Sequence, residues 1–304
     1  MSIEQMLKDS WNKDYELKWE EKSQLSRAEF QIPEHQRIIV IHNSIREDYE
    51  KKKKSEAEER QNKQRICCLD DEVNVKNNSV PYGSLFFRIS LFPALRFHLF
   101  AQPLEHRDYP LASDHKTVMD FVSETNFAIY QNLKGSGAGI PDHVHYQGHL
   151  RENFPLLTDS LHEPLPEKTN EFFDVSYPQM LVFGVLFKMK NEKAKEKVSY
   201  LIEEVGKEIN KQGIAYNLMF DKNKVFLFPR TREIVKNLPY ELKGSGIDQW
   251  QIGGQEMGNL FNSKYLSVFQ RLSWNVLNYV LRETTVTDKT QQKYLKELVH
   301  RRIR

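Results

Sequence analysis

The sequence consists of two stretches, each with extended apolar runs and one long amphipathic segment, separated by a proline-rich connector. Residues 155–178 hold four prolines among acidic residues, which is typical of a connection between domains. On either side, aromatic and β-branched runs indicate strands. We expect an α+β protein with two halves, residues 1–154 and 155–304, in which helices pack on an antiparallel sheet. The halves share strands and one long helix, although the order of elements is expected to differ.

In the first half, two strands are predicted before a long helix. The runs SLFFRISLF (84–92) and LRFHLFAQPL (95–104) are separated by Pro93, and residues 38–45 form another short apolar segment. Apolar residues then recur at helical spacing, which predicts a helix of about five turns over 113–133 with Ser113 as its cap. It ends at the glycine-rich turn 135–139, and residues 143–150 alternate like a strand.

The second half shows a similar set of elements. Residues 179–190 indicate a strand, and residues 191–212 a helix with one apolar face. Residues 214–221 and 224–230 are expected to form a hairpin around Lys222 and Asn223. The last stretch, 259–304, is predicted to be helical.

The charge balance argues against nucleic acid or a membrane as the main partner. With 44 Lys and Arg against 42 Asp and Glu, the chain has a net charge of only +2. The longest apolar run, Met180–Phe187, is eight residues long, and a membrane span needs about 20. No secretory signal is visible at the start, so we expect a cytoplasmic protein. Residues 46–65 are almost wholly polar and predict a solvated helix or arm.

A glycine-rich turn followed by a row of histidines is the main candidate for chemistry. In a strand over 143–150, alternate side chains share one face, and these are His143, His145, Gln147 and His149. The preceding turn contains Gly135, Gly137 and Gly139, whose backbone N–H groups could approach phosphate oxygens. Lys134 could add a phosphate contact, although an exposed lysine at a helix end is the more ordinary interpretation.

This stretch resembles the histidine triad superfamily, and more closely its transferase branch. That branch holds galactose-1-phosphate uridylyltransferase, diadenosine tetraphosphate phosphorylase and the GDP-hexose phosphorylases, whose members carry a small-residue turn followed by His-x-His-x-Gln. The resemblance covers about residues 82–150, where further family positions fall on Pro93, His98, His106 and Asn132. Ser90 stands where asparagine is common and Phe97 where glycine is usual. A weaker match covers residues 216–230 and 253–258.

The resemblance implies ping-pong nucleotidyl transfer on a nucleotide sugar or dinucleoside polyphosphate, with phosphate or a sugar phosphate as the second substrate. His145 would be the nucleophile that forms a nucleotidyl-histidine, and His143 would orient it. Gln147 would mark the transferase branch, because an amide cannot pass a proton to water. Substrate contacts would come from Asn132, Lys134, Gly137, Gly139, His98, His106 and His149. No cofactor is expected, and the sequence is compatible with a homodimer.

Three alternatives remain at this point. The first is a catalytically impaired nucleotide-binding protein on the same scaffold, for which Ser90 and Phe97 are mild evidence. In the second, three histidines with Glu152 would bind a metal, as in β-barrel dioxygenases. In the third, the histidines only satisfy buried hydrogen bonds. Some uridylyltransferases hold a structural zinc with a C-x-x-C pair, but adjacent cysteines such as Cys67 and Cys68 chelate one ion poorly, so no metal site is expected.

Overall fold

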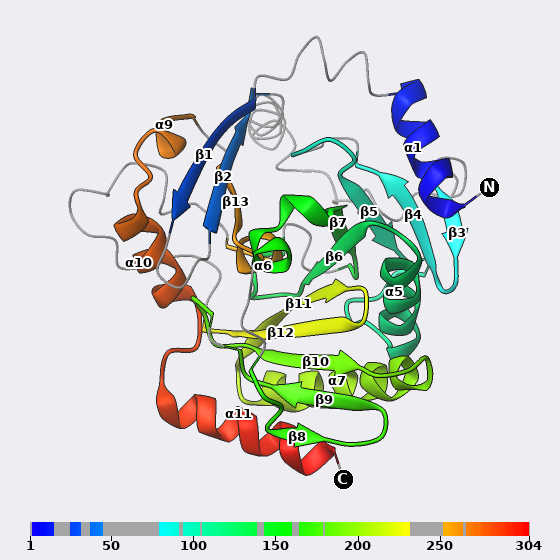
Figure 1. Cartoon of the computed structure of the whole chain (residues 1–304), viewed down its shortest axis with the longest axis vertical. Coiled ribbons are helices and arrows are strands. Elements are labelled where there is room, and N and C mark those ends of the chain that lie inside the picture. The colour runs from blue at the N-terminus through cyan, green and yellow to red at the C-terminus, as the bar shows by residue number, and fades with distance from the viewer. Residues whose placement is uncertain are drawn as a thin grey trace, which may run out of the picture.

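A large twisted sheet runs through the molecule and is covered on both faces (Figure 1). The computed structural model describes residues 2–14, 25–31, 37–44, 79–90, 94–103, 105–138, 143–159, 164–178, 180–231, 252–263 and 266–303. The predicted arm at 46–65, both cysteines, Pro93 and Gly139 lie outside this part of the chain. No described helix is long and apolar enough to cross a membrane.

The described strands of the large sheet number ten, and every neighbouring pair is antiparallel, as predicted. The first half supplies β3 (Val80–Tyr82), β4 (Leu85–Ile89), β5 (Leu99–Gln102), helix α5 (Ala112–Glu124), β6 (Phe127–Asn132) and β7 (Tyr146–Leu150). The second supplies β8 (Lys168–Thr169), β9 (Phe173–Ser176), β10 (Val185–Met189), helix α7 (Lys193–Lys211), β11 (Ala215–Asp221) and β12 (Lys224–Arg230).

Both halves have the same topology. Each runs three strands, one helix and two strands along the chain, and from the outer edge inward the strands lie in the order first, second, third, fifth, fourth. The expectation that the order of elements differs is therefore wrong. The halves meet where β6 pairs with β11, with Asn132 opposite Asn217. They are thus joined through equivalent strands into one continuous sheet.

A smaller sheet and several helices complete the fold. Strands β1 (Leu25–Gln31), β2 (Arg37–Asn43) and β13 (Leu260–Ser263) lie in that order, with β13 parallel to β2. The remaining helices are α1 (Ile3–Asp14), the one-turn α6 (Pro155–Thr158), α8 (Gly254–Met257), α9 (Leu266–Phe269), α10 (Trp274–Thr284) and α11 (Lys289–Arg302), with a 3₁₀ turn at Arg151–Asn153.

The two faces of the large sheet contribute to two separate cores. On one face, α5, α7 and α11 pack on alternate strand residues such as Ile129 and Tyr146. On the other, β2, α6, α8 and α10 cover the intervening residues, among them Tyr130 and Met219. This alternation follows from the two-residue period of a strand. Tyr130 therefore lies on the face covered by the small sheet, α6 and α8.

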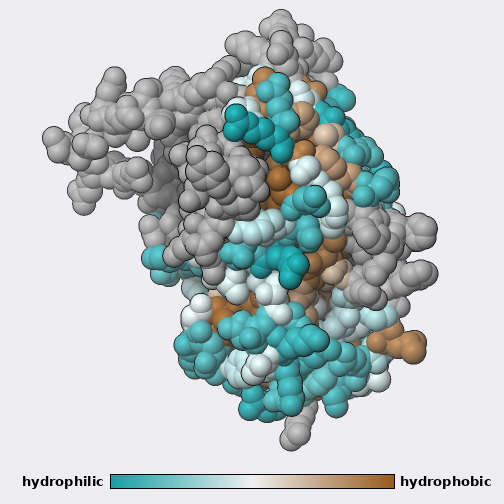
Figure 2. All heavy atoms as spheres, turned by 90° about the vertical axis from the view of Figure 1, so that its left-hand side faces the viewer, coloured by the Kyte–Doolittle hydropathy of each residue, from teal (hydrophilic) through white to brown (hydrophobic). Residues whose placement is uncertain are grey.

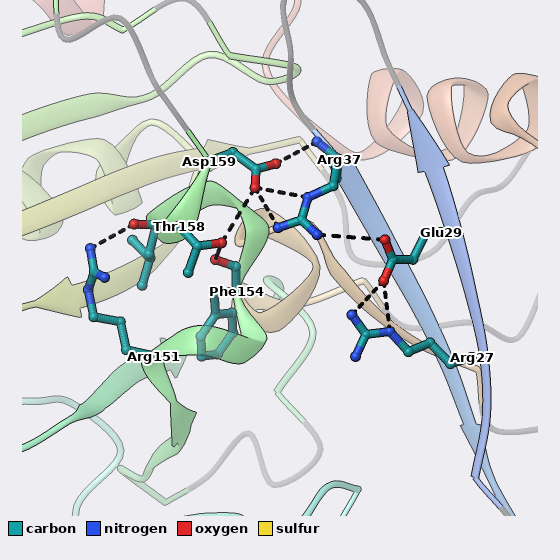
Figure 3. Close-up of polar contacts among 8 residues, drawn as sticks. Arg27, Glu29, Arg37, Arg151, Phe154, Thr158 and Asp159 are labelled. Atoms are coloured by element: carbon teal, nitrogen blue, oxygen red, sulfur yellow. Dashed lines mark hydrogen bonds and ion pairs between the residues drawn. The ribbon is translucent and has the colours of Figure 1, made fainter.

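An ion-pair network ties the small sheet to α6 (Figure 3). The Asp159 carboxylate accepts hydrogen bonds from the Arg37 backbone N–H at 2.8 Å and from its guanidinium at 2.7 and 3.0 Å. Arg37 also lies 3.6 Å from Glu29 on β1.

On the side of the molecule that carries α9 and α10, apolar residues form a narrow band between hydrophilic ones (Figure 2).

Several predicted elements are confirmed, and two are wrong, one of them at Leu260–Ser263, which form strand β13 within the stretch 259–304 that is predicted to be helical. The β11–β12 hairpin turns at Lys222 and Asn223, and α7 lies within its predicted range. The predicted helix over 113–133, however, ends at Glu124, and residues 127–132 form β6. This apolar and aromatic segment is central in the sheet, where pairing on both sides and burial favour a strand.

Two further details differ from the prediction. The cap of α5 is not Ser113, because the helix begins after Leu111, whose backbone N–H donates to the Asp114 carboxylate at 3.0 Å. The strand predicted over 143–150 begins only at Tyr146. His143 and His145 therefore lie in the segment that enters β7 and not within its ladder.

Candidate active site

Strand β7 places the motif between two neighbouring strands. Gln147 pairs with Tyr130 of β6 on one side and with Phe100 of β5 on the other. His149 lies two residues further and therefore on the same face as Gln147. The sheet thus presents Gln147, His149 and Tyr130 towards the layer that contains α6 and α8.

His145 is held as a neutral imidazole with a defined tautomer. Its Nδ1 lies 2.9 Å from the backbone carbonyl oxygen of His143, so Nδ1 carries the proton and donates it. Nε2 then keeps its lone pair. Burial disfavours the imidazolium and lowers the pKa of His145 to about 4. The ring of Phe100 stacks on the imidazole with centroids 5.2 Å apart. Near neutral pH, His145 can therefore act as a nucleophile through Nε2.

The amide of Gln147 is held by its oxygen. Gln147 Oε1 lies 3.0 Å from the Tyr130 hydroxyl and 3.2 Å from His98 Nε2. The backbone N–H of Ala94 donates to His98 Nδ1 at 3.2 Å, so Nε2 of neutral His98 carries the proton and donates to Gln147. Asn43 on β2 donates to the Ala94 carbonyl at 3.2 Å, which ties the small sheet to this loop. With its oxygen engaged, the Gln147 amide nitrogen is left to donate.

A fifth residue closes this group from the far end of the chain. Gln255 on α8 has its Oε1 2.9 Å from the Tyr130 hydroxyl and 3.3 Å from His149 Nε2. The rings of His149 and His98 lie 4.4 Å apart. We call these five residues the Gln147 cluster: His98, Tyr130, Gln147, His149 and Gln255. It brings together three residues that the sequence predicted and two that it missed.

The two missed residues had weak local signals. Tyr130 falls in a segment whose apolar spacing predicts the end of a helix, so the sequence does not reveal that it pairs with Gln147. Gln255 lies in residues 253–258, where the weaker part of the resemblance indicated a related segment but assigned no residue a role. Only the fold brings it to Tyr130.

Asn132 links the first half to α8. Its Oδ1 accepts the backbone N–H of Gly254 at 2.6 Å and the side-chain amide of Asn217 at 2.9 Å. Arg230, fully buried, in turn donates to Asn217 Oδ1 at 2.7 Å and to the carbonyl of Ile252 at 3.0 Å. These contacts hold the segment that carries Gln255 against β6.

The glycine turn is confirmed as a turn and packs against the same segment. Gly135 and Gly137 have φ values of +81° and +90°, in the region that favours glycine. A Cβ on Gly137 would lie 2.4 Å from the Ile252 carbonyl oxygen, so only glycine permits this close approach. Lys134 is exposed at the start of the turn. Contacts of Asn132, Lys134, Gly137 and Gly139 with a substrate stay predictions.

His106 and His143 form a pair outside the Gln147 cluster. Their rings meet edge to face with centroids 4.9 Å apart, His143 being buried and His106 exposed. Among the described residues, no group of three or more His, Cys, Asp or Glu side chains could hold a metal ion. Cys67 and Cys68 are outside that part of the chain.

Comparison with known proteins supports the fold and leaves the activity open. A domain of unknown function, DUF4922, matches residues 4–150. No curated protein sequence matches the chain. Yeast Ap4A phosphorylase Apa2 superimposes with a TM-score of 0.62 at 16% identity, covering 97% of this chain and 98% of that one.

The same yeast enzyme has also been solved with ligands. Its complex with AMP gives a TM-score of 0.61 at 14% identity, covering 95% of this chain and 99% of that one. Its complex with Ap4A gives 0.58 at 12%, covering 92% and 97%. This chain therefore shares the fold of that enzyme along nearly its whole length, as the α+β prediction expects.

Proposed function

We propose that this chain is a phosphorylase or nucleotidyltransferase that acts on a dinucleoside polyphosphate or a nucleotide sugar through a nucleotidyl-His145 intermediate. The observation that carries the proposal is the hydrogen bond from His145 Nδ1 to the His143 carbonyl, which leaves Nε2 unprotonated for attack. The neighbouring Gln147 amide, held by its oxygen, supplies donors for a phosphate.

In the first step, His145 Nε2 attacks the α-phosphorus of the nucleotide. The new N–P bond forms as the bond from phosphorus to the bridging oxygen breaks. The group that leaves with the electron pair is a nucleoside polyphosphate when the substrate is a dinucleoside polyphosphate, and a sugar phosphate when it is a nucleotide sugar. In the second step, phosphate or a sugar phosphate attacks the same phosphorus and releases Nε2. The Gln147 Nε2–H group donates to a non-bridging oxygen whose charge grows in both steps.

In this proposal, the two halves of the chain have different roles. We assign the nucleophile to residues 1–154 and a supporting role to residues 155–304. The topological equivalent of β7 in the second half is β12, Lys224–Arg230, whose sequence KVFLFPR has no histidine. The second half would therefore act through α8, which brings Gln255 to the cluster.

The direct test is to trap the intermediate. Purified protein would be incubated with Ap4A, ADP-glucose, UDP-glucose or a GDP-hexose without an acceptor, and its intact mass measured before proteolytic mapping. We expect a stoichiometric, acid-labile nucleotidyl adduct on the peptide that contains His145, discharged when phosphate is added. Turnover of a substrate without any such adduct would exclude the covalent route.

A second candidate, an impaired nucleotide-binding protein, is favoured by the backbone at Phe97. This residue has φ +58°, a conformation that favours glycine, and it stands where the related enzymes usually have glycine. Its ring packs against Trp11 at 5.3 Å. If strain beside His98 has cost the chain its activity, the wild type would bind nucleotides without adduct, and Phe97→Gly would restore adduct formation.

A further inference from the structure

A cavity lies at the far edge of the large sheet from the Gln147 cluster. It has a volume of about 470 Å³ and is lined by Lys168, Glu297, His300, Arg301 and Ile303. Strand β8 and helix α11 form it, side by side at one end of the molecule (Figure 1). The outermost strand β8 is six strands from β7, or about 29 Å at the usual spacing of strands. A cavity of this size fits a small organic molecule.

Two cations, Lys168 and Arg301, border this cavity beside a single lining carboxylate, Glu297. Within the part of the chain that the structure describes, neither Lys168 nor Arg301 forms an ion pair, and Arg301 Nε reaches only the carbonyl oxygen of Glu297 at 3.4 Å. His300 Nε2 is buried and has no hydrogen-bond partner among the same residues. Lys168 and Arg301 therefore border a single cavity, and neither is paired with a carboxylate among the described residues.

The carboxylates nearby do not neutralise these cations. Glu167 pairs with Lys296 at 2.8 Å, and Glu204 pairs with Arg302 at 3.4 Å. Glu297 borders the cavity and lies 4.0 Å from Lys293. The pKa of His300 is lowered by burial first and then by the positive charge of Lys168. Two cations, Lys168 and Arg301, face one carboxylate, Glu297, in the lining, so the cavity carries net positive charge that can attract an anion.

The walls of the cavity are ordered by aromatic contacts. The ring of Tyr177 meets the His300 ring edge-on at 5.9 Å, and Lys296 Nζ lies 4.1 Å from the Tyr177 ring centroid. These contacts hold the His300 imidazole against the Tyr177 ring. Ile303 adds an apolar wall beside the charged groups. The combination suits an anionic group attached to an organic body.

We propose that this cavity binds a small molecule carrying a phosphate group, at a site separate from the Gln147 cluster. A phosphate dianion offers several acceptor oxygens, which suit the planar donors of Arg301 and the point charge of Lys168, while the adjacent His300 ring reports on the occupied cavity. The proposal does not depend on the activity of the first site.

The test is a titration followed at His300 itself. Full-length protein with ¹³C-labelled histidine, in a His145→Asn background so that no adduct forms, is titrated with inorganic phosphate and with AMP. The His300 resonance is assigned with His300→Asn. We expect it to shift saturably, with binding at least tenfold weaker in Lys168→Gln/Arg301→Gln. Both side chains are exposed, so this variant should fold.

A matched control lies on the same helix. Lys289→Gln removes one exposed charge 12 residues before Arg301, about 18 Å away along the helix, and should bind phosphate as the parent does. Tighter binding of AMP than of phosphate would place the organic body in the cavity, and equal binding would limit the site to the phosphate group. An unmoved resonance, an equal shift in the double variant, or the same shift with sodium chloride at equal ionic strength would overturn the proposal.

Discussion

The side-chain oxygens of Tyr130 and Gln255 lie 2.9 Å apart, although 125 residues separate them in the chain. The same Tyr130 hydroxyl lies 3.0 Å from Gln147. A tyrosine has one hydroxyl hydrogen, so it donates to one of the two amide oxygens at a time. Gln255 therefore competes for the group that orients Gln147, and the second half of the chain influences the amide at the proposed reaction centre.

This relationship predicts coupled effects of Tyr130→Phe and Gln255→Ala. Tyr130→Phe should lower the rate of adduct formation by about five- to tenfold, because loss of one hydrogen bond costs about 1 kcal/mol. Gln255→Ala leaves the Tyr130 hydroxyl to Gln147 alone and should raise the rate modestly. Nucleotide affinity should change little. In a double-mutant cycle, Gln255→Ala should have no effect in the Tyr130→Phe background, because the hydroxyl for which Gln255 competes is absent there. Tyr200→Phe on the exposed face of α7 is the matched control. Strictly additive effects would show that the two side chains act independently.

His145→Ala should abolish turnover and leave nucleotide binding intact, because removal of a covalent nucleophile costs several decades in rate. Steady-state kinetics and calorimetric titration measure the two effects. His149→Asn is the comparison, because it alters a member of the Gln147 cluster but leaves the nucleophile in place, so the adduct should still form, although more slowly. A His145→Ala enzyme within tenfold of the wild type would end the covalent proposal.

The pKa of His145 predicts an acid limb of adduct formation near pH 4, well below the usual histidine value of 6.5. Only the neutral ring attacks, and burial keeps it neutral down to that pH. Unfolding has a related dependence: between about pH 6.5 and pH 4 the unfolded chain binds more protons at this residue, so stability falls as the pH falls through that window. Rapid-quench rates and denaturant titrations at several pH values, with His145→Asn as reference, measure both. An acid limb at pH 6.5 would contradict the assignment.

Gln147→His should raise hydrolysis relative to transfer. The amide cannot pass a proton to water, whereas an imidazole at the same place can, since it would lie between Tyr130 and His98. Product analysis with and without phosphate gives the ratio. Gln147→Asn, which keeps the amide, should show no such rise. A fixed or falling ratio in the histidine variant would remove the argument that Gln147 marks a transferase.

The purified protein should contain less than one zinc per chain and need none for activity. Two thiolates on separate corners of a tetrahedron, each about 2.3 Å from the ion, are not readily supplied by adjacent residues such as Cys67 and Cys68. Elemental analysis before and after chelation, with activity followed in parallel, measures this. Stoichiometric zinc that survives the chelator would move His143 from an orienting role to that of a metal ligand.

The sequence predicts elements well where one local pattern is unambiguous. Val198, Leu201, Ile202, Val205 and Ile209 recur every three or four residues, and α7 buries all five. The same reasoning fails at β6, because Thr125 and Ile129 continue the spacing of α5 by coincidence across the true end at Glu124. Burial between β7 and β11, which no local pattern records, decides the outcome.

Only part of the candidate site can be predicted from the sequence. The segment 143–150 carries its own chemistry, so His145 and Gln147 stand out without a structure. Tyr130 and Gln255 are recognised only through strand pairing and through the contacts that hold α8 beside β6. These two polar residues belong to the site only because the fold places them there, and a single sequence does not reveal that placement.

The pairing of β6 with β11 has a consequence for the chain as a whole. Each strand is the inner edge of its own half, so either half alone would expose an apolar strand edge, which invites aggregation. The halves thus stand to each other as obligate subunits fused into one polypeptide. Because one polypeptide carries both halves, each inner edge strand always has its partner at hand, and neither edge stays exposed once the chain has folded.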